Sequence, residues 1–468
     1  VIYSQLLVYY LQRRHSLESP VQTPLDNGGG LPVRSRYRIL VGLVLAFALI
    51  AAACGDDDSS GDTTTTTEAM EETTTTTEAM EETTTTAAPE TTTTAAALPP
   101  LVVWADDKFG PIIEQIAVPF TEQTGVPVAV TVIDFQDMRE QITTQAPAGE
   151  GPDMFIGAHD WLGEMVANGI AAPQDFGDNS ANFAPVSLDA FSSAGNVYAM
   201  PYAIEAVALF YNADLVSTPP TSVAELTALC DELGDTIENC WGIQGGGSAA
   251  DAFHNFPFVG TKGGYIFGFD SATGFDVTDI GLDSEGAIAG VAAMEQLVAD
   301  GYIAPIDEDD AKQLFIDGKE AFFMSGPWWI NTWDEAGINW GVTTLPTLDG
   351  DPMAPFVGVR GFYVSEFGQN KAIAEEFLNG FVATDETMLA LFEADPRGPA
   401  WIPIQDQAVG FEAFAQSASN GLFMPNVPEM GAVWEPLGNQ LLGVRNLQVT
   451  AEEAMTQAAE QVANAVGG

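Results

Sequence analysis

Residues 198–212 read YAMPYAIEAVALFYN and are apolar almost throughout. A run of this kind, rich in aromatic and β-branched residues, is typical of a buried extended segment. Glu205 lies in its middle, and a buried carboxylate is strongly unfavourable unless it is paired, hydrogen-bonded or reached by water in a cleft. Two interpretations stay open from this stretch alone. Glu205 either ends a strand and faces water, or lies on a strand that crosses between two lobes and faces whatever lies between them.

The chain before this stretch alternates between strand and helix patterns. Short apolar strands are predicted at 101–105, 126–133 and 152–158, with helices at 111–125 and 136–145. This alternation predicts an α/β fold with a parallel sheet covered on both faces, and ligands of such sheets bind at the carboxyl ends of the strands. The residues that follow the first and third strands are polar or aromatic: Asp106, Asp107, Lys108, His159, Asp160 and Trp161.

The composition limits the classes of function. With 468 residues, 46% of them apolar, the chain has room for two or three domains and a sizeable core. Its net charge of −52, from 66 acidic and 14 basic residues, repels phosphate backbones and excludes nucleic acid as a partner. Only three histidines are present, and residues 307–310 (DEDD) lack the glycine and the terminal glutamate of a calcium loop. We therefore expect no cofactor and no metal site, and expect residues 307–310 to begin a helix.

The N-terminal part is typical of an export signal. Residues 34–38 are basic, and residues 39–53 form an apolar run of 15 that ends in three alanines, too short for a comfortable membrane span. Cys54 follows directly, and this ending resembles a bacterial lipobox, in which the cysteine is lipidated. We expect a protein anchored through Cys54 to the outer face of the cell membrane; a secreted or periplasmic protein cleaved after Ala53 is the alternative. The first methionine of the chain, Met70, lies inside the tether that follows. We therefore expect translation to start at a non-standard codon near Val33, so that residues 1–53 hold a signal peptide preceded by an extension that is not translated.

Residues 54–100 have the composition of a tether. The decapeptide TTTTTEAMEE occurs twice, at 63–72 and 73–82, and no aromatic residue lies between Cys54 and Trp104. Such a segment cannot bury a core and is expected to be a disordered spacer. Further along, Cys230 and Cys240 are ten residues apart. In an exported protein this pair predicts a disulfide, the alternative being two reduced buried thiols.

Several longer motifs resemble one known family, the maltose/maltodextrin-binding proteins of ABC importers. The resemblance is collinear from Leu101 to about Gly468. It is carried by GPDMFIGAHD (151–160), YAMPYAIEA (198–206), FYNADL (210–215), SGPW (325–328), PFVGV (355–359) and MPNVPEM (424–430). It implies a two-lobed, type II periplasmic-binding-protein-like α/β fold with a ligand cleft between lobes that are joined by crossing strands. The implied N-terminal lobe is 101–203 with 362–409, the C-terminal lobe is 208–355 with 410–468, and the crossings include 204–207 and 357–361.

The resemblance also implies the ligand-binding residues. Hydroxyl groups of sugars need charged hydrogen-bonding partners, and the apolar faces of their rings need aromatic surfaces. The positions matching polar contacts of the family are Asp107, Lys108, Asp160 and Glu205. The positions matching its stacking aromatics are Trp328 and Trp434. Three further residues of the expected ligand-binding set depart from the family pattern: Asp251 replaces a glutamate, Phe253 a tyrosine and Trp161 an arginine. Gly157 stands where the family has a stacking tryptophan, and Trp161 either replaces that ring or only packs. Arg139 falls near a family glutamate, and Gly438 near a family arginine.

The implied function is capture of an α-glucoside, such as maltose, a maltodextrin or trehalose, by lobe closure, followed by delivery to the permease subunits of an ABC importer. We expect a monomer that is not an enzyme. Two alternatives remain: the same fold binding a different carbohydrate or a non-sugar solute, and a tethered glycoside hydrolase that uses two of the site carboxylates. We expect His159 to orient its loop, and Trp104, Trp329 and Trp340 to lie in the core.

Overall fold

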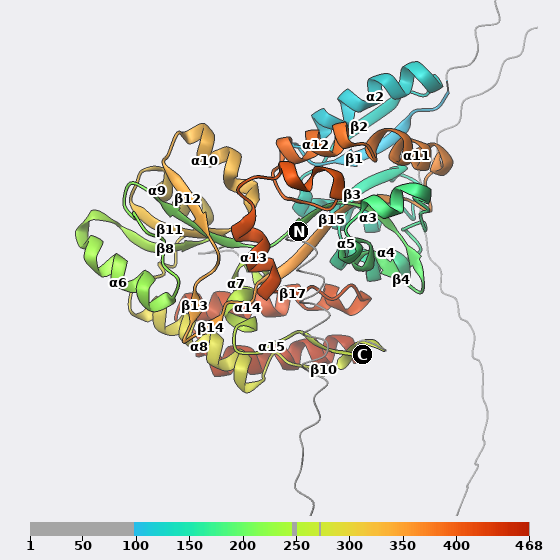
Figure 1. The fold of residues 1–468 in the computed structure, drawn as a ribbon. Helices are drawn as coiled ribbons and strands as arrows, with labels where there is room; N and C mark the ends of the chain where they lie inside the picture. The colour runs from blue at the N-terminus through green and yellow to red at the C-terminus, as the bar shows by residue number, and fades with distance from the viewer. Residues whose placement is uncertain (1–97, 246–249, 271–272, 468) are drawn as a thin grey trace, which may run out of the picture. The chain divides into compact units, whose positions relative to one another are not determined.

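The computed structural model describes residues 98–245, 250–270 and 273–467 (Figure 1). The predicted signal peptide, Cys54 and most of the predicted tether lie outside the described residues. Within the described ranges, no helix has both the length and the apolar character needed to cross a membrane.

The first sheet begins with three parallel strands. Strand β1 (Leu101–Ala105) lies between β2 (Val128–Val132) and β3 (Met154–Ala158), and the register pairs Leu101 with Val128 and Val103 with Met154. Helices α2 (Gly110–Thr124) and α3 (Phe135–Gln145) connect the strands, and Asp134 caps α3 by accepting a hydrogen bond from the N–H of Gln136. The predicted α/β alternation is therefore confirmed.

The three strands predicted to be parallel are parallel, and strands from later in the chain make the sheet mixed. Strand β15 (Phe356–Val364) lies between β3 and β6 (Ala199–Glu205) and runs antiparallel to both. Strand β16 (Gly398–Pro399) pairs antiparallel with the other side of β6, and β17 (Leu422–Phe423) pairs parallel with the start of β15. The local pattern predicted strands but not their direction, because a strand from a distant part of the chain enters the sheet in whichever direction its connection imposes.

The second sheet has the order β12 (Trp340–Thr343), β7 (Ala208–Asn212), β11 (Glu320–Ser325) and β8 (Asn239–Ile243). Figure 1 shows β8, β11 and β12 near α6, α9 and α10, with α14 and α15 near the C-terminus. These helices are α6 (Val223–Leu233), α7 (Ala252–Gly260), α8 (Glu285–Ala299), α9 (Glu308–Ile316), α10 (Ile330–Ala336), α14 (Trp434–Arg445) and α15 (Ala451–Val466). The predicted helix start at the acidic run is confirmed, since α9 begins at Glu308.

The remaining elements are short. The helices are α4 (Leu162–Ala167), α5 (Pro185–Ala190), α11 (Lys371–Phe377), α12 (Asp385–Ala394) and α13 (Glu412–Asn420), with a π-helical turn at Leu378–Val382. The 3₁₀ turns are His159–Trp161, Gly177–Asn182, Gly234–Thr236, Pro327–Trp329, Ile402–Gln407 and Pro428–Ala432. Three hairpins pair β4 (Ser192–Ser193) with β5 (Asn196–Val197), β9 (Phe267–Asp270) with β10 (Gly274–Ile280), and β13 (Thr347–Leu348) with β14 (Asp351–Pro352).

The buried apolar residues form separate cores around the two sheets. The first core draws on residues between 101 and 206 and between 357 and 404, with Ala418. The main second core draws on residues between 207 and 356 and between 424 and 462, and a smaller cluster around Trp333 covers another part of the second sheet. Only Ala206 and Val207, both buried, separate β6 from β7. We call these two regions the first and second lobes; the boundaries implied by the family resemblance stay a prediction.

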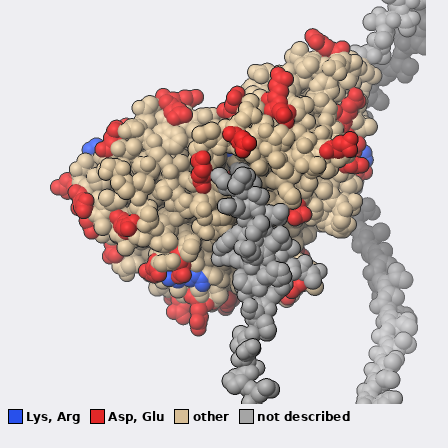
Figure 2. All heavy atoms as spheres, viewed as in Figure 1, with Lys and Arg blue, Asp and Glu red and all other residues tan. Residues whose placement is uncertain are grey.

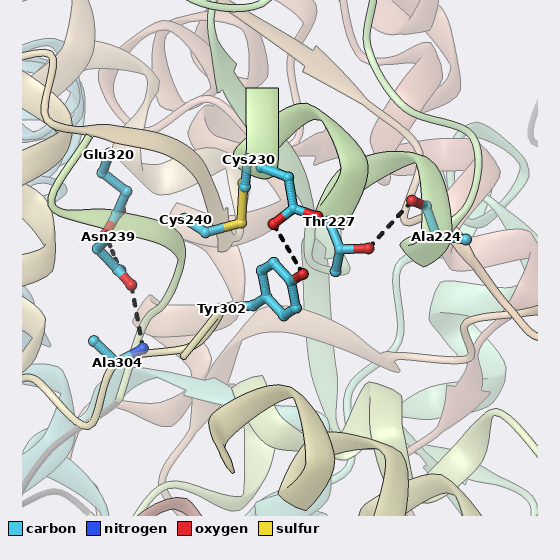
Figure 3. The surroundings of a disulfide bond; sticks show 9 residues. Ala224, Thr227, Cys230, Asn239, Cys240, Tyr302, Ala304 and Glu320 are labelled. Atoms are coloured by element: carbon cyan, nitrogen blue, oxygen red, sulfur yellow. Dashed lines mark hydrogen bonds between the residues drawn. A yellow bond between two sulfur atoms is a disulfide. The ribbon is translucent and has the colours of Figure 1, made fainter. Parts of the chain in front are cut away.

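Cys230 and Cys240 are joined by a disulfide that links the last part of α6 to β8, with 5.6 Å between their Cα atoms (Figure 3). Beside it, the Oη of Tyr302 donates a hydrogen bond of 3.0 Å to Asp231, and Asn239 bonds both Glu320 and the N–H of Ala304. The bridge therefore fastens a surface helix to a buried strand of the second lobe.

The surface has many more acidic than basic side chains. Figure 2 shows Asp and Glu spread over the visible face, with few Lys or Arg among them. Nine of the 14 basic residues lie after residue 97, and two of these nine, Arg360 and Arg397, are buried in ion pairs. The buried cations therefore mark the places where the fold has a specific use for positive charge.

Candidate functional site

The end of β6 brings Glu205 into a network of buried charges. Glu205 is only 8% exposed, and its Oε2 pairs with NH1 of Arg397, which precedes β16. The Nε of Arg397 donates to Asp395 at 2.6 Å, and Asp395 also pairs with Nζ of Lys108 at 3.2 Å. The sequence identified Glu205 as anomalous, and the structure supplies the partner that makes its burial tolerable.

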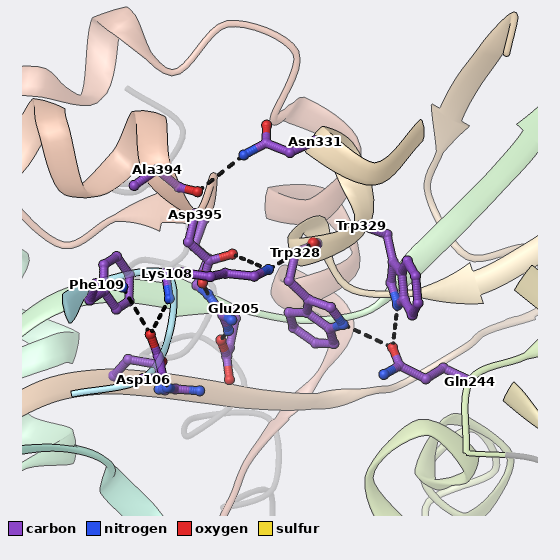
Figure 4. A network of polar contacts seen from close by, with 12 residues as sticks. Asp106, Lys108, Phe109, Glu205, Gln244, Trp328, Trp329, Asn331, Ala394 and Asp395 are labelled. Carbon is purple, nitrogen blue, oxygen red and sulfur yellow. Dashed lines mark hydrogen bonds and ion pairs between the residues drawn. The ribbon is translucent and has the colours of Figure 1, made fainter. Parts of the chain in front are cut away.

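Trp328 of the second lobe meets these cations of the first (Figure 4). The guanidinium carbon of Arg397 lies 4.8 Å from the centroid of the Trp328 ring, within cation–π range. The Nζ of Lys108 donates to the main-chain oxygen of Trp328 at 3.1 Å. Nearby, Asn331 donates to the carbonyl of Ala394 at 3.1 Å. Three predicted contacts, Glu205, Lys108 and Trp328, therefore lie in one network.

Gln244 fixes the orientation of the Trp328 ring. Its Oε1 accepts hydrogen bonds from the indole N–H groups of Trp328 at 2.8 Å and Trp329 at 2.7 Å, and also from the hydroxyl of Ser325. Its amide nitrogen donates to Glu308 at 3.2 Å. The Trp328 ring is therefore held at its edge by an amide and on a face by a guanidinium.

The predicted aromatic residues of the second lobe belong to one cluster. Phe253 lies 6.2 Å from Trp328 and 6.2 Å from Phe356, measured between ring centroids. Phe356 in turn lies 5.8 Å from Trp434 in an edge-to-face arrangement. Trp328, Phe253 and Trp434 are each partly buried, so part of each ring remains accessible. The cluster is linked through Phe356, which the sequence did not single out.

Asp160 lies in the 3₁₀ turn after β3 and is close to Trp434 of this cluster. It is 4% exposed, and its Oδ2 is 3.9 Å from NH1 of Arg139, which is bound more closely to Glu164 at 2.8 Å. Burial raises the pKa of Asp160, while Arg139 and the approaching side chain of Trp434 favour its charged form. Asp160 of the first lobe and Trp434 of the second therefore lie close together; their contact with a sugar stays a prediction.

The ring of Trp161 packs beside Gly157. Trp161 is 6% exposed and stacks on Phe135 with 4.9 Å between centroids. A Cβ atom at Gly157 would lie 2.8 Å from the Trp161 ring and 2.8 Å from Tyr363. Trp161 thus fills the space that a side chain at 157 would need, and it packs in the first core rather than standing in the open.

The remaining predicted residues lie at different places around the site. Asp251 caps α7 and accepts hydrogen bonds from the N–H of His254 at 2.9 Å and from its ring at 2.7 Å. Asp107 is exposed in the turn after β1. At Gly438, a Cβ atom would be 2.4 Å from the carbonyl oxygen of Ala250, so the family arginine has no room there.

His159 fixes the loop that carries Asp160. Its Nδ1 accepts a hydrogen bond from the N–H of Val359 at 3.0 Å, which requires Nε2 to donate to the carbonyl of Met424, also at 3.0 Å. Burial lowers the pKa of His159 to about 4, although both backbone bonds act in the other direction. The expected orienting role is confirmed, and the ring ties β15 to the segment that follows β17.

A groove of about 570 Å³ opens beside Asp160. One wall is a polar face of α3, and the other is the 3₁₀ turn at 428–432. Its lining residues are Gln136, Arg139, Glu140, Thr143, Thr144, Glu164, Pro428, Gly431 and Ala432. Through Arg139 the groove borders the predicted site. Among the described residues, no group of three or more His, Cys, Asp or Glu side chains is arranged to hold a metal ion.

Sequence reasoning missed Arg397, Asp395 and Gln244. The only available signal was the pair Asp395 and Arg397, two opposite charges among apolar residues, prolines and a glycine between 394 and 404. Such a pair predicts a buried ion pair but not its partner, Glu205, which lies 192 residues away.

Residues 115–408 match the family described as bacterial extracellular solute-binding protein. A galactooligosaccharide-binding protein of Bacillus subtilis is 29% identical over 77% of this chain and 88% of its own length. A maltodextrin-binding protein of the same organism is 27% identical over 77% and 90%. A maltooligosaccharide ABC transporter solute-binding lipoprotein of Streptococcus pneumoniae is 25% identical over 78% and 90%.

Proposed function

Because this chain belongs to the bacterial extracellular solute-binding proteins, we propose that it captures a neutral oligosaccharide, an α-glucoside such as maltose, a maltodextrin or trehalose, for an ABC importer. The observation that carries the proposal is the meeting of Glu205, Arg397 and Trp328, which puts paired charges beside an aromatic ring. Sugar hydroxyls need the first and sugar ring faces need the second. Relatives whose names state maltodextrin, maltooligosaccharide and galactooligosaccharide binding support the same class of ligand.

The mechanism is capture by closure of the two lobes. Trp328 and Trp434 belong to the second lobe, whereas Lys108 and Asp160 belong to the first. A sugar that touches both sets favours the closed state, because only that state makes all the contacts. The closed protein, a monomer, then docks on the permease subunits. Cys54 carries the lipid anchor on the outer face of the membrane, as in the relative named a lipoprotein.

We further propose that the protein binds its sugar without cleaving it. Hydrolysis needs one carboxylic acid and one free carboxylate across the scissile bond. Glu205 is instead paired with Arg397, Asp251 is committed to the N-terminus of α7, and Asp160 is buried beside Arg139 and Trp434, so that Asp107 alone of the four candidate carboxylates is exposed. Prolonged incubation with a bound oligosaccharide should leave it intact by chromatography, and release of shorter sugars would favour the hydrolase.

Thermal melting against a sugar panel tests the proposal. The panel contains maltose, maltotriose, trehalose, sucrose, cellobiose, glucose and a galactooligosaccharide. A ligand specific for the folded state at a hundred times its Kd stabilises it by about 2.7 kcal/mol, which raises the melting temperature by several degrees. A shift with an α-glucoside supports the proposal and names the sugar. A shift only with the galactooligosaccharide or cellobiose moves the specificity to another glycan, and no shift with any sugar rejects the proposal.

A further inference from the structure

We propose that Arg397 is a positioning residue of the sugar site, which aims the Glu205 carboxylate, fixes the Trp328 ring and balances the charge of the buried carboxylates beside it. The inference rests on the proposed function, since it concerns how that site handles a sugar. Nothing in the sequence pattern or in the family resemblance assigned a role to Arg397.

Arg397 is fixed by a carboxylate on each side. Arg397 has an 8% exposed side chain and contacts a carboxylate on each side, Glu205 through NH1 and Asp395 through Nε. A guanidinium is a rigid planar fork, so two such bonds fix its plane as well as its position. Glu205 is thereby held in one orientation at the point where β6 leaves the first sheet.

The Trp328 ring is held by both Arg397 and Gln244. The same fixed guanidinium lies 4.8 Å from the centroid of the Trp328 ring, and Gln244 holds the indole N–H at 2.8 Å. The plane of the ring is thus set from two directions before a ligand arrives. A sugar that stacks on this cluster meets a preorganised surface, which lowers the conformational cost of binding.

The charges in the network around Arg397 balance one another. The charged network has three cations and three anions: Lys108, Arg360, Arg397, Asp106, Glu205 and Asp395. Arg360 joins the network by its pairing with Asp106 at 3.4 Å. Two further titratable groups sense these charges: the hydroxyl of Tyr202, and the carboxyl of Asp160, which also has Arg139 at 3.9 Å. A balanced network suits an uncharged ligand, because a buried extra charge would lack a partner.

Two variants separate charge from geometry. Arg397→Gln removes the cation and leaves Glu205 and Asp395 with one positive neighbour fewer, so one of them takes up a proton more readily. Arg397→Lys keeps the charge but loses the planar fork. Lys371→Gln is the control, because it breaks an ion pair with Glu366 of 2.6 Å that is exposed and remote from the site.

The experiment is calorimetric titration of the parent and the three variants with the sugar from the melting panel, between pH 5 and pH 8. We expect a parent Kd that is flat with pH. Arg397→Gln should bind about tenfold or more weakly at pH 8, because Glu205 and Asp395 lose their shared cation and lobe closure then buries an unbalanced negative charge. Its affinity should recover as the pH falls and one of the two carboxylates takes up a proton, which is seen as a buffer-dependent heat. Arg397→Lys should bind more weakly than the parent with a flat pH profile, and Lys371→Gln should match the parent.

The outcomes are distinguishable. If the parent binds no sugar of the panel, the proposed function fails and this inference fails with it. If the parent binds but both Arg397 variants keep its Kd and its flat profile, only the inference is overturned. If Arg397→Gln does not fold, Arg397→Lys decides alone, because a parent-like Kd in that variant contradicts the positioning role.

Discussion

The contact between Trp434 and Asp160 offers the sharpest quantitative prediction. Trp434 begins α14 in the second lobe, is partly buried and lies edge-to-face with Phe356 at 5.8 Å. Its side chain also approaches the buried carboxyl of Asp160 in the first lobe. The indole therefore offers both a ring surface for the sugar and a polar link between the lobes. Trp434→Ala removes both, whereas Trp434→Phe keeps a ring and removes only the N–H.

The two contributions have different sizes. A central, partly buried tryptophan that anchors a ligand is worth roughly 2 kcal/mol or more when truncated to alanine. The N–H beside a buried carboxyl adds about 1 kcal/mol. Since 1.4 kcal/mol corresponds to a tenfold change, Trp434→Ala should weaken sugar binding about a hundredfold and Trp434→Phe about fivefold.

Calorimetric titration of both variants at pH 7 measures these losses. Trp340→Phe is the matched control, because its indole also donates to an aspartate, Asp334, at 2.9 Å, but from a half-buried position in β12 of the second sheet. It should leave the Kd unchanged. Parent-like affinity in Trp434→Ala would refute the assignment of Trp434 to the sugar site. Equal losses in the alanine and phenylalanine variants would show that the N–H, not the ring, carries the contact.

Three further predictions concern stability. Because the pKa of His159 is about 4 in the folded protein and 6.5 in the unfolded chain, its neutral form adds about 3 kcal/mol to the free energy of unfolding above pH 6.5, and this stability is lost as the pH falls toward 4. Denaturant unfolding should show this fall in the free energy of unfolding in the parent but not in His159→Gln. In Gly163→Ala, the new Cβ would lie 2.1 Å from the nitrogen of Pro428, so the melting temperature should fall by several degrees. Gly380→Ala is the control, because open space surrounds that position and its melting temperature should change little. Equal melting temperatures of the two variants would contradict the tight packing of α4 on 428–432. Replacing Cys230 and Cys240 together by serine should cost roughly 2–4 kcal/mol in denaturant unfolding, and an unchanged midpoint would mean that the bridge stabilises nothing.

The elements of the first lobe could be predicted because their signals are local. The strand at 101–105 and the helix at 136–145 follow from apolar spacing, and the structure places β1 at the same residues and α3 within one residue. The direction of β15 could not be predicted, because it depends on a connection through the whole second lobe. Local pattern specifies an element, whereas the path of the chain specifies its neighbours.

In the candidate site, too, residues with a local sequence signal could be predicted and long-range contacts could not. Glu205 was identifiable because a carboxylate inside an apolar run needs a physical explanation. Arg397 was not identifiable, because its contact with Glu205 spans 192 residues and leaves no periodic trace in either segment. Trp161 is intermediate: its proximity to Gly157 in sequence suggested that one replaces the ring missing at the other, and the structure shows it filling that space.

The central claim is that a sugar binds between the two lobes at this network. The most direct measurement is a crystal structure of the protein grown with the sugar that gives the largest melting shift. The account predicts a sugar ring in contact with Trp434 and with the Glu205–Arg397–Trp328 group, touching residues of both lobes. A sugar bound only in the groove along α3, or elsewhere on the surface, with Glu205 and Trp434 making no contact to it, would contradict the account.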